Sequence, residues 1–349
     1  MKSSFVPSSF QTIAGSRAGG EGGGRGGRIM QDTVLGSDAP RRTERRTGTI
    51  RKRMWSQRQL IWMSFPLLIY IVLFAYVPIW GWLMAFQQYR PGFSVFNQQW
   101  VGWDQFHFLF SDEGFLQVLR NTVAMSLINM VLGFVTAIGF AILLNEIRKS
   151  LAKRFIQTIS YLPHFLSWVI VTGIVATSLS TEDGIVNIVL MKLHLIDSPI
   201  LWLGEGKYFW GIVGASHVWK EVGWNAIIYL AAIASVDPSL YEAAEIDGAN
   251  RYRKMLHITL PGIKPVIIIL LIMNLGHILD AGFEVQYLLG NGQVVDWSQT
   301  IDIFVLKYGL KVGNYSLATA AGMFKTVVSI VLLFLANSIA KRLGEERLI

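Results

Sequence analysis

Cysteine is missing from all 349 residues of the sequence, and charged residues are scarce, at 15% against 52% hydrophobic. The absence of cysteine excludes disulfide bonds, thiolate metal ligands and cysteine nucleophiles. A soluble domain has about a quarter of its residues charged, so much of the surface of this chain does not face water. The six histidines are scattered along the sequence and predict no metal site.

Signatures of catalysis and of ATP binding are also missing. The sequence has no Gly-x4-Gly-Lys-Ser/Thr phosphate loop, no His-Glu-x-x-His metal motif and no Gly-x-Ser-x-Gly nucleophile elbow. We therefore expect a chain that is not an enzyme by itself and has neither catalytic residues nor a cofactor of its own.

The net charge of +8 lies entirely in the N-terminal segment. Residues 1–58 hold 12 basic and 4 acidic side chains, whereas the rest of the chain holds 19 of each. The segment contains a Gly/Arg-rich run over residues 19–28, and it has no apolar stretch of the 7–15 residues found in a signal peptide. We predict a disordered, basic cytoplasmic tail rather than an RNA-binding segment, and we expect no nucleic-acid partner.

Six stretches are long and apolar enough to cross a membrane, which takes about 20 predominantly apolar residues. These stretches cover residues 61–86, 118–144, 156–180, 208–234, 263–289 and 317–340. The sequence therefore predicts an all-α, multi-pass membrane protein with six spans, whose transmembrane domain covers residues 59–349.

Lysine and arginine indicate how the spans are oriented. Basic clusters occur before the first span, between the second and third, between the fourth and fifth, and after the last, whereas the alternate loops are sparse in basic residues. Under the positive-inside rule, six spans put every cluster and both termini in the cytoplasm, and five or seven would not. We expect the bacterial cytoplasmic (inner) membrane.

The loop between the fourth and fifth spans, residues 237–261, contains an ordered series of helix signals. Asp237 can cap a short helix, or Ser239 and Glu242 can form an alternative capping box. Gly248 supplies a turn in which positive φ is tolerated. We predict a short helix, a break, and a second helix that leads into the fifth span.

Two adjacent alanines on that short helix form a surface that another protein can approach closely. The sequence reads Glu-Ala-Ala, three residues, glycine, nine residues, then Ile-x-Leu-Pro. The signature positions are Glu242, Ala243, Ala244, Gly248, Ile258, Leu260 and Pro261, with Asp247 beside the glycine. This pattern resembles the EAA motif of ABC-importer permeases, and it lies where that family has it, on the cytoplasmic side before the penultimate span.

The resemblance implies a type I ABC-importer permease fold in which the 237–261 loop docks as a coupling helix on an ATP-hydrolysing subunit. It also implies several partners: a second, homologous permease, two ATP-binding subunits that hold ATP and Mg²⁺, an extracytoplasmic solute-binding protein, and the surrounding membrane lipid. The solute-binding protein would dock on the outer loops near residues 87–117, 181–207 and 290–316.

Flanking segments extend the resemblance over most of residues 60–340. Tyr161–Trp168, Trp219–Asn225 and Tyr315–Ala320 are similar to segments of the sugar-type permeases. Within that class the chain most resembles the oligosaccharide and polysaccharide permeases, including the first permease of the alginate importer. The implied cargo is a carbohydrate, with an acidic one such as an alginate oligosaccharide among the candidates, and the alternative is an amino-acid or peptide permease.

Ionisable residues inside a span are costly and usually face a cavity or a partner. Spans four and five each carry a polar stripe with aromatic residues that can stack on sugar rings. The predicted substrate path comprises His217, Lys220, Glu221, Trp224, Asn225, Asn274, His277, Asp280, Phe283, Glu284 and Tyr287. The alternative is internal pairing of Lys220, or of Lys325 in span six, with Asp280 or Glu284. His164, near the cytoplasmic end of span three, is expected to pack helices.

Two other classes of protein compete with this interpretation. An ion-coupled secondary transporter would use Asp280 or Glu284 as its coupling carboxylate. It predicts internal inverted repeats, which we do not find in the sequence, and it leaves the Glu-Ala-Ala helix unexplained. A membrane receptor or scaffold without a transport role is the second.

Overall fold

The computed structural model describes residues 57–342. The chain divides into one unit that ends at Ser64 and a second that begins at Phe65. The predicted disordered tail over residues 1–58 lies, apart from its last two residues, outside the described part of the chain.

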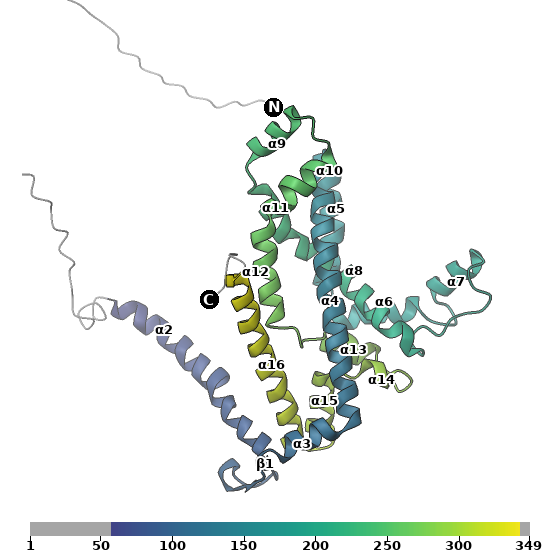
Figure 1. Ribbon diagram of the computed structural model, residues 1–349. Helices are drawn as coiled ribbons and strands as arrows, with labels where there is room; N and C mark the ends of the chain where they lie inside the picture. The colour runs from purple at the N-terminus through teal and green to yellow at the C-terminus, as the bar shows by residue number, and fades with distance from the viewer. Residues whose placement is uncertain (1–56, 343–349) are drawn as a thin grey trace, which may run out of the picture. The chain divides into compact units, whose positions relative to one another are not determined.

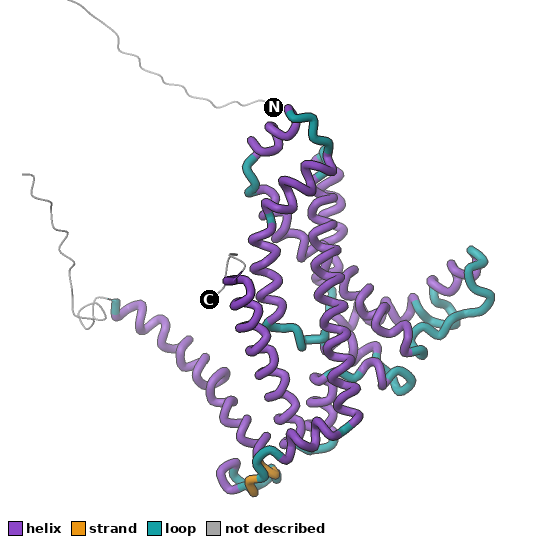
Figure 2. The backbone as a smooth tube through the Cα atoms, in the orientation of Figure 1, coloured by secondary structure: helices purple, strands orange, loops and turns teal. Residues whose placement is uncertain are grey.

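Most of the described chain is helical (Figures 1 and 2). The first membrane-length stretch and the strand pair that follows it are α2 (Arg58–Ile71), η1 (Val72–Tyr76), η2 (Val77–Phe86), β1 (Gln87–Gln88), η3 (Val95–Asn97) and β2 (Gln99–Trp100). The next helices are α3 (Asp104–Ser111), α4 (Glu113–Asn145), α5 (Ser150–Tyr161), η4 (Leu162–Phe165), α6 (Trp168–Ser178), α7 (Ile185–Lys192) and α8 (Gly206–Ala234). The two short strands pair antiparallel, with Gln87 opposite Trp100.

The second half of the chain begins with a run of short helices. These are α9 (Pro238–Ile246), α10 (Arg251–Lys254), η5 (Met255–Thr259) and α11 (Leu260–Gly262). They lead into α12 (Lys264–Leu275), α13 (Phe283–Leu289), α14 (Val295–Ser298), α15 (Ile301–Leu306), η6 (Lys307–Lys311) and the long α16 (Tyr315–Arg342).

Three helical stretches of the described chain are long and apolar enough to cross a membrane, namely Arg58–Phe86, Glu113–Asn145 and Tyr315–Arg342. Two bent helix pairs each count as one further span and raise the number to five, namely Ser150–Phe165 with Trp168–Ser178, and Arg251–Gly262 with Lys264–Leu275. The remaining predicted span coincides with α8, which has 29 residues. Polar side chains such as Lys220 and Glu221 make α8 less apolar than the other spans.

The predicted third span, residues 156–180, is not one straight helix. The segments Ser150–Phe165 and Trp168–Ser178 meet at an angle of 102°. Pro163 lies in the last turn before the bend and has no amide hydrogen to donate. Ser167 then starts α6, because its hydroxyl accepts a hydrogen bond from the Ile170 amide at 3.4 Å.

The predicted fifth span, residues 263–289, is also interrupted. Helix α12 ends at Leu275, and α13 begins only at Phe283. Gly282 starts α13 with φ of +83°, a left-handed conformation that a residue with a Cβ adopts at a cost. The expectation that the polar residues of this span share one helical face is therefore wrong for those beyond Leu275.

Helices α4 and α8 pack along each other and form the centre of the unit. Small residues allow the close approach: a Cβ atom on Gly214 would lie 3.0 Å from Ile128 Cγ2. Buried Ala137, Ala226 and Tyr229 continue the same interface toward α12.

Candidate functional site

The short helix α9 is delimited as its sequence predicts. The carboxylate of Asp237 accepts a hydrogen bond from the Ser239 amide at 2.9 Å, and Pro238 occupies the first turn. Hydrogen bonds from the backbone and side chain of Ser239 lower the pKa of the Asp237 carboxyl. At the other end Gly248 has φ of +73°, and Ala249 donates to the Ala244 carbonyl at 2.8 Å. Asp237, rather than the alternative capping box, caps the helix.

Much of α9 is exposed. Glu242 and Ala243 are exposed, as are the apolar side chains of Leu240 and Ile246, and Ala244 is half-buried. Of the later signature positions, Asp247, Gly248 and Pro261 are exposed, while Ile258 and Leu260 are half-buried. The first part of the motif therefore forms a surface, and its aliphatic residues nearer α12 pack partly inward.

Side-chain contacts attach α9 to the rest of the unit. The hydroxyls of Tyr241 and Thr259 are hydrogen-bonded at 2.9 Å, and Lys254 Nζ lies 3.5 Å from Glu245. Thr259 is buried beside the entry into α12. These contacts link movement of α9 to the short helices that precede α12.

A polar cluster attaches the bend between α5 and α6 to α8. Glu221 Oε2 lies 2.7 Å from His164 Nδ1, and its Oε1 lies 3.3 Å from Lys220 Nζ. The ammonium of Lys220, which is only 5% exposed, also donates to the His164 carbonyl at 2.6 Å. Lys220 therefore has its partners at the bend and on α8, and the predicted pairing with Asp280 or Glu284 is absent from the described residues.

A small polar cavity of about 120 Å³ lies between α4, α8 and α12. His217 and Asn225 on α8 line it together with Asn274 on α12, so three predicted path residues meet in one space. Asn129 on α4 lines the same cavity, and its buried Oδ1 has no hydrogen-bond partner among the described residues. An unsatisfied buried carbonyl favours a polar ligand or water in this cavity.

Lys325 on α16 is held by two carboxylates. Its Nζ lies 2.5 Å from Asp280 Oδ1 and 2.6 Å from Asp302 Oδ1, and His277 Nδ1 lies 3.1 Å from the other oxygen of Asp280. The pairing of Lys325 with Asp280, one of the two alternatives from the sequence, is present. These three elements, the break after α12, α15 and α16, line a pocket of about 460 Å³.

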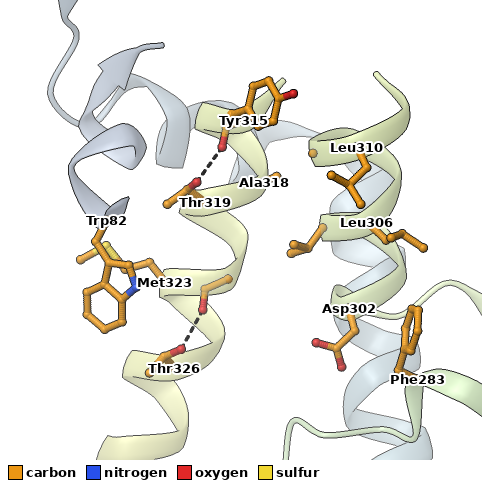
Figure 3. A pocket seen from close by; sticks show the side chains of 13 residues that line it. Trp82, Phe283, Asp302, Leu306, Leu310, Tyr315, Ala318, Thr319, Met323 and Thr326 are labelled. Atoms are coloured by element: carbon orange, nitrogen blue, oxygen red, sulfur yellow. Dashed lines mark hydrogen bonds between the residues drawn. The ribbon is translucent and has the colours of Figure 1, made fainter. Parts of the chain in front are cut away.

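A second pocket, of about 570 Å³, continues from the first along α15 and α16. The two share Asp302, Val305, Gly322 and Thr326. Figure 3 shows the carboxylate of Asp302 on α15 turned toward α16. Trp82 and Phe283 also line this second pocket. Aromatic faces beside hydroxyl and carboxylate groups are a combination that suits a carbohydrate, which presents both C–H faces and hydroxyls.

The remaining predicted path residues are arranged less uniformly. Phe283 and Tyr287 stack with ring centroids 5.4 Å apart, and Trp224 stacks on His164. Glu284 is exposed on α13 and forms no ion pair within the described chain. The predicted path is thus divided between the bend cluster, the small cavity and the pockets along α16.

Two residues that line these cavities, Asp302 and Asn129, are not among the predicted path residues. Asp302 lies in the predicted outer loop of residues 290–316, so no rule about charges inside spans points to it. Asn129 is one polar residue in the second span, and an isolated asparagine there carries no spacing signal.

Comparison with known proteins places these features in a family. The family model of the binding-protein-dependent transport system inner membrane component matches residues 129–345. The polygalacturonan/rhamnogalacturonan transport system permease protein YteP of Bacillus subtilis (strain 168) is 42% identical over 294 residues, which cover 84% of this chain and 91% of the relative. Protein LplB of the same organism is 41% identical over 286 residues, covering 82% and 89%.

Solved structures resemble this one over most of its length. One is a bacterial ABC transporter involved in the import of the acidic polysaccharide alginate, with a TM-score of 0.78, 38% identity, and coverage of 83% of this chain and 98% of that chain. Another is a bacterial alginate ABC transporter in complex with an alginate pentasaccharide-bound periplasmic protein, with a TM-score of 0.79, 37% identity, and coverage of 86% and 99%.

Proposed function

The chain belongs to the family of binding-protein-dependent transport system inner membrane components, and we propose that it is the permease subunit of an ATP-driven importer of a sugar or oligosaccharide. The names of similar proteins support a carbohydrate cargo, and alginate and polygalacturonan support an acidic one. The same names argue against an amino-acid or peptide permease. An ion-coupled mechanism is also disfavoured, because Asp280 is already paired with Lys325.

The proposed topology has six spans, with α8 as the fourth and with the bent pairs as the third and fifth. Both termini are then cytoplasmic, and the protein is a multi-pass component of the bacterial inner membrane. The distribution of Lys and Arg supports this orientation, as does the length of α8, which at about 1.5 Å per residue is sufficient to cross the hydrocarbon core.

The coupling to ATP is assigned to α9 and its flanks, namely Glu242, Ala243, Ala244, Asp247, Gly248, Ile258, Leu260 and Pro261. The observation that carries this proposal is that α9 is exposed, is delimited by the Asp237 cap and left-handed Gly248, and is attached to Thr259 through Tyr241. A helix attached in this way moves together with the segment that leads into α12. ATP and Mg²⁺ would be bound by two partner ATPase subunits, and this chain would hold no cofactor.

The cargo path is assigned to the small cavity and to the pockets along α16, with the second, homologous permease completing the other wall. An extracytoplasmic solute-binding protein would deliver the oligosaccharide at the outer loops. Closure of the ATPases would move α9 and rock the helices between inward-open and outward-open states. Hydroxyls of the sugar would then form hydrogen bonds with His217, Asn225 and Asn274. The aromatic residues Phe283 and Tyr287 would contact the faces of the sugar rings.

The test is co-purification of the tagged chain from gently solubilised membranes, with Glu242→Arg and Ala243→Trp as variants. We expect the wild-type chain to retain an ATPase and a second permease, and both variants to lose the ATPase. Glu182→Arg is the matched control, because it reverses an exposed charge on a predicted outer loop. Transport that continues without any ATPase would overturn the proposal.

A further inference from the structure

Helix α5 has an apolar stripe that no described part of the chain covers. Leu151 is 80% exposed, Phe155 67%, Ile159 55% and Leu162, in the following turn, 63%. The spacing of four, four and three residues puts these side chains on one face of a helix. The opposite face packs on α8, where a Cβ atom on Gly223 would lie 2.1 Å from the Ser160 carbonyl oxygen, so the stripe faces away from the protein.

Basic residues gather at the start of this stripe. Arg148, Lys149 and Arg154 are exposed, and Lys153 is half-buried. None of the four lies in an ion pair with another residue of the described chain. Glu146, the acidic side chain nearest in sequence, lies instead 4.0 Å from Arg251.

The first turn of α5 adds to this positive potential. Its N-cap, Lys149, makes no side-chain capping bond, and the turn contains no acidic residue. Helix N-termini carry a partial positive charge and free amide hydrogens. Lysine and arginine at such a position are repelled by this partial charge and destabilise the start of the helix. A bound anion would remove this repulsion.

We propose that this surface, the basic turn of residues 148–154 with the stripe Leu151, Phe155, Ile159 and Leu162, binds an anionic phospholipid. The phosphate lies at the basic turn, and the acyl chains lie along the stripe. From Leu151 to Leu162 a helix rises about 16 Å, which matches one leaflet of a hydrocarbon core about 30 Å thick. Clusters of four or more basic residues beside a membrane helix attract anionic lipids in the same way.

The occupant is a lipid and not a soluble anion, because a phosphate group alone makes no contact with the apolar stripe. The site lies at the end of the molecule that carries α9, since Arg251 of α10 lies beside the end of α4, and Figure 1 shows the start of α5 at that end. The inference rests on the chain being a membrane protein and is independent of which cargo it carries.

The experiment measures the phospholipid that co-purifies with the assembled transporter in mild detergent. It compares the wild type with the triple variant Arg148→Gln, Lys149→Gln, Arg154→Gln. The matched control removes the same charge from predicted outer loops, as Lys192→Gln, Lys207→Gln, Lys311→Gln. Nanodiscs of phosphatidylcholine, with and without phosphatidylglycerol, then test whether the anionic lipid raises the unfolding temperature.

We expect the triple variant to lose at least about tenfold in retained phosphatidylglycerol, since each basic side chain near the surface contributes about 1 kcal/mol, and the control to keep it. Phe155→Ser, which leaves all charges in place, should also lower retention and thereby show that the stripe takes part. Equal retention in the triple variant and the control would overturn the proposal. So would loss of the ATPase or second permease from the triple variant at unchanged lipid content, because the surface would then be a protein interface.

Discussion

The imidazole ring of His164 lies parallel to the indole ring of Trp224, with centroids 4.4 Å apart and an angle of 1° between the planes. His164 lies in η4, at the bend between α5 and α6, and Trp224 lies on α8. Glu221, one turn before Trp224, holds the imidazole through its Nδ1 atom. The stack and the hydrogen bond together fix where the bend sits on α8, and the following changes test that arrangement and others.

Glu221→Gln removes the carboxylate that faces both His164 and buried Lys220. The ammonium of Lys220 then retains its hydrogen bond to the His164 carbonyl but loses its charged partner. We expect the free energy of unfolding to fall by about 1.5–3 kcal/mol, the contribution of a hydrogen bond to a charged group. The measurement is thermal unfolding in detergent. Glu205→Gln, which affects only the exposed pair with Lys207, should leave the unfolding temperature unchanged, and equal shifts in both variants would contradict the prediction.

Gly223→Ala places a Cβ atom 2.1 Å from the carbonyl oxygen of Ser160. Because that oxygen belongs to the backbone, α5 has to move away from α8, and overpacking of this kind costs about 1–3 kcal/mol. Gly211→Ala is the control on the same helix, since no heavy atom lies within 4 Å of its Cβ position. There the higher helix propensity of alanine should give up to about 1 kcal/mol of stability. The prediction fails if Gly223→Ala is as stable as Gly211→Ala.

Lys325→Met leaves the carboxylates of Asp280 and Asp302 beside each other without their common cation. We expect a loss of stability smaller than the about 3–5 kcal/mol that removing one member of a buried pair costs, because the Asp280 side chain is 52% exposed, and a strong loss of transport. Asp302→Asn retains the pair of Lys325 with Asp280 and should be much milder. Uptake of labelled oligosaccharide and thermal unfolding would both show this order, and the reverse order would rule out Lys325 as the shared partner.

Gly248→Val puts a β-branched residue at φ of +73°. No heavy atom lies within 4 Å of the added Cβ, so the whole penalty comes from the left-handed backbone, about 1–2 kcal/mol. If α9 docks on the ATPase, the affinity of the two proteins should fall about 5–30-fold, while Gly248→Asn should retain more of it, because asparagine tolerates this conformation. Gly292→Val, at a glycine that is also open but not left-handed, should not change the affinity.

The features that the sequence predicts best are those determined by neighbouring residues. The cap at Asp237 and the left-handed turn at Gly248 follow from side chains one or two positions away. The shared cavity of His217, Asn225 and Asn274 follows from helical spacing on two spans. Each of these features depends on local backbone geometry or on the regular helical spacing, which α8 and α12 retain.

The features that the sequence does not predict depend on tertiary contacts. A hydropathy window averages over the bend at Ser167 and over the break that ends at Gly282, because both lie within apolar sequence. Once α12 ends at Leu275, the helical spacing that placed Glu284 on a common face with Asn274 no longer applies. Asp302 joins Lys325 only because α15 packs beside α16, which no spacing rule contains.

The sharp bend of the third segment also affects how the protein enters the membrane. A chain that turns by 102° leaves backbone groups around Leu166 and Ser167 outside a regular helix, and hydrocarbon offers them no hydrogen bonds. The carbonyl of His164 finds its donor on Lys220, which the ribosome adds 56 residues later. The third segment is therefore completed only when α8 arrives, so the two are expected to leave the insertion machinery together, as one unit of biogenesis.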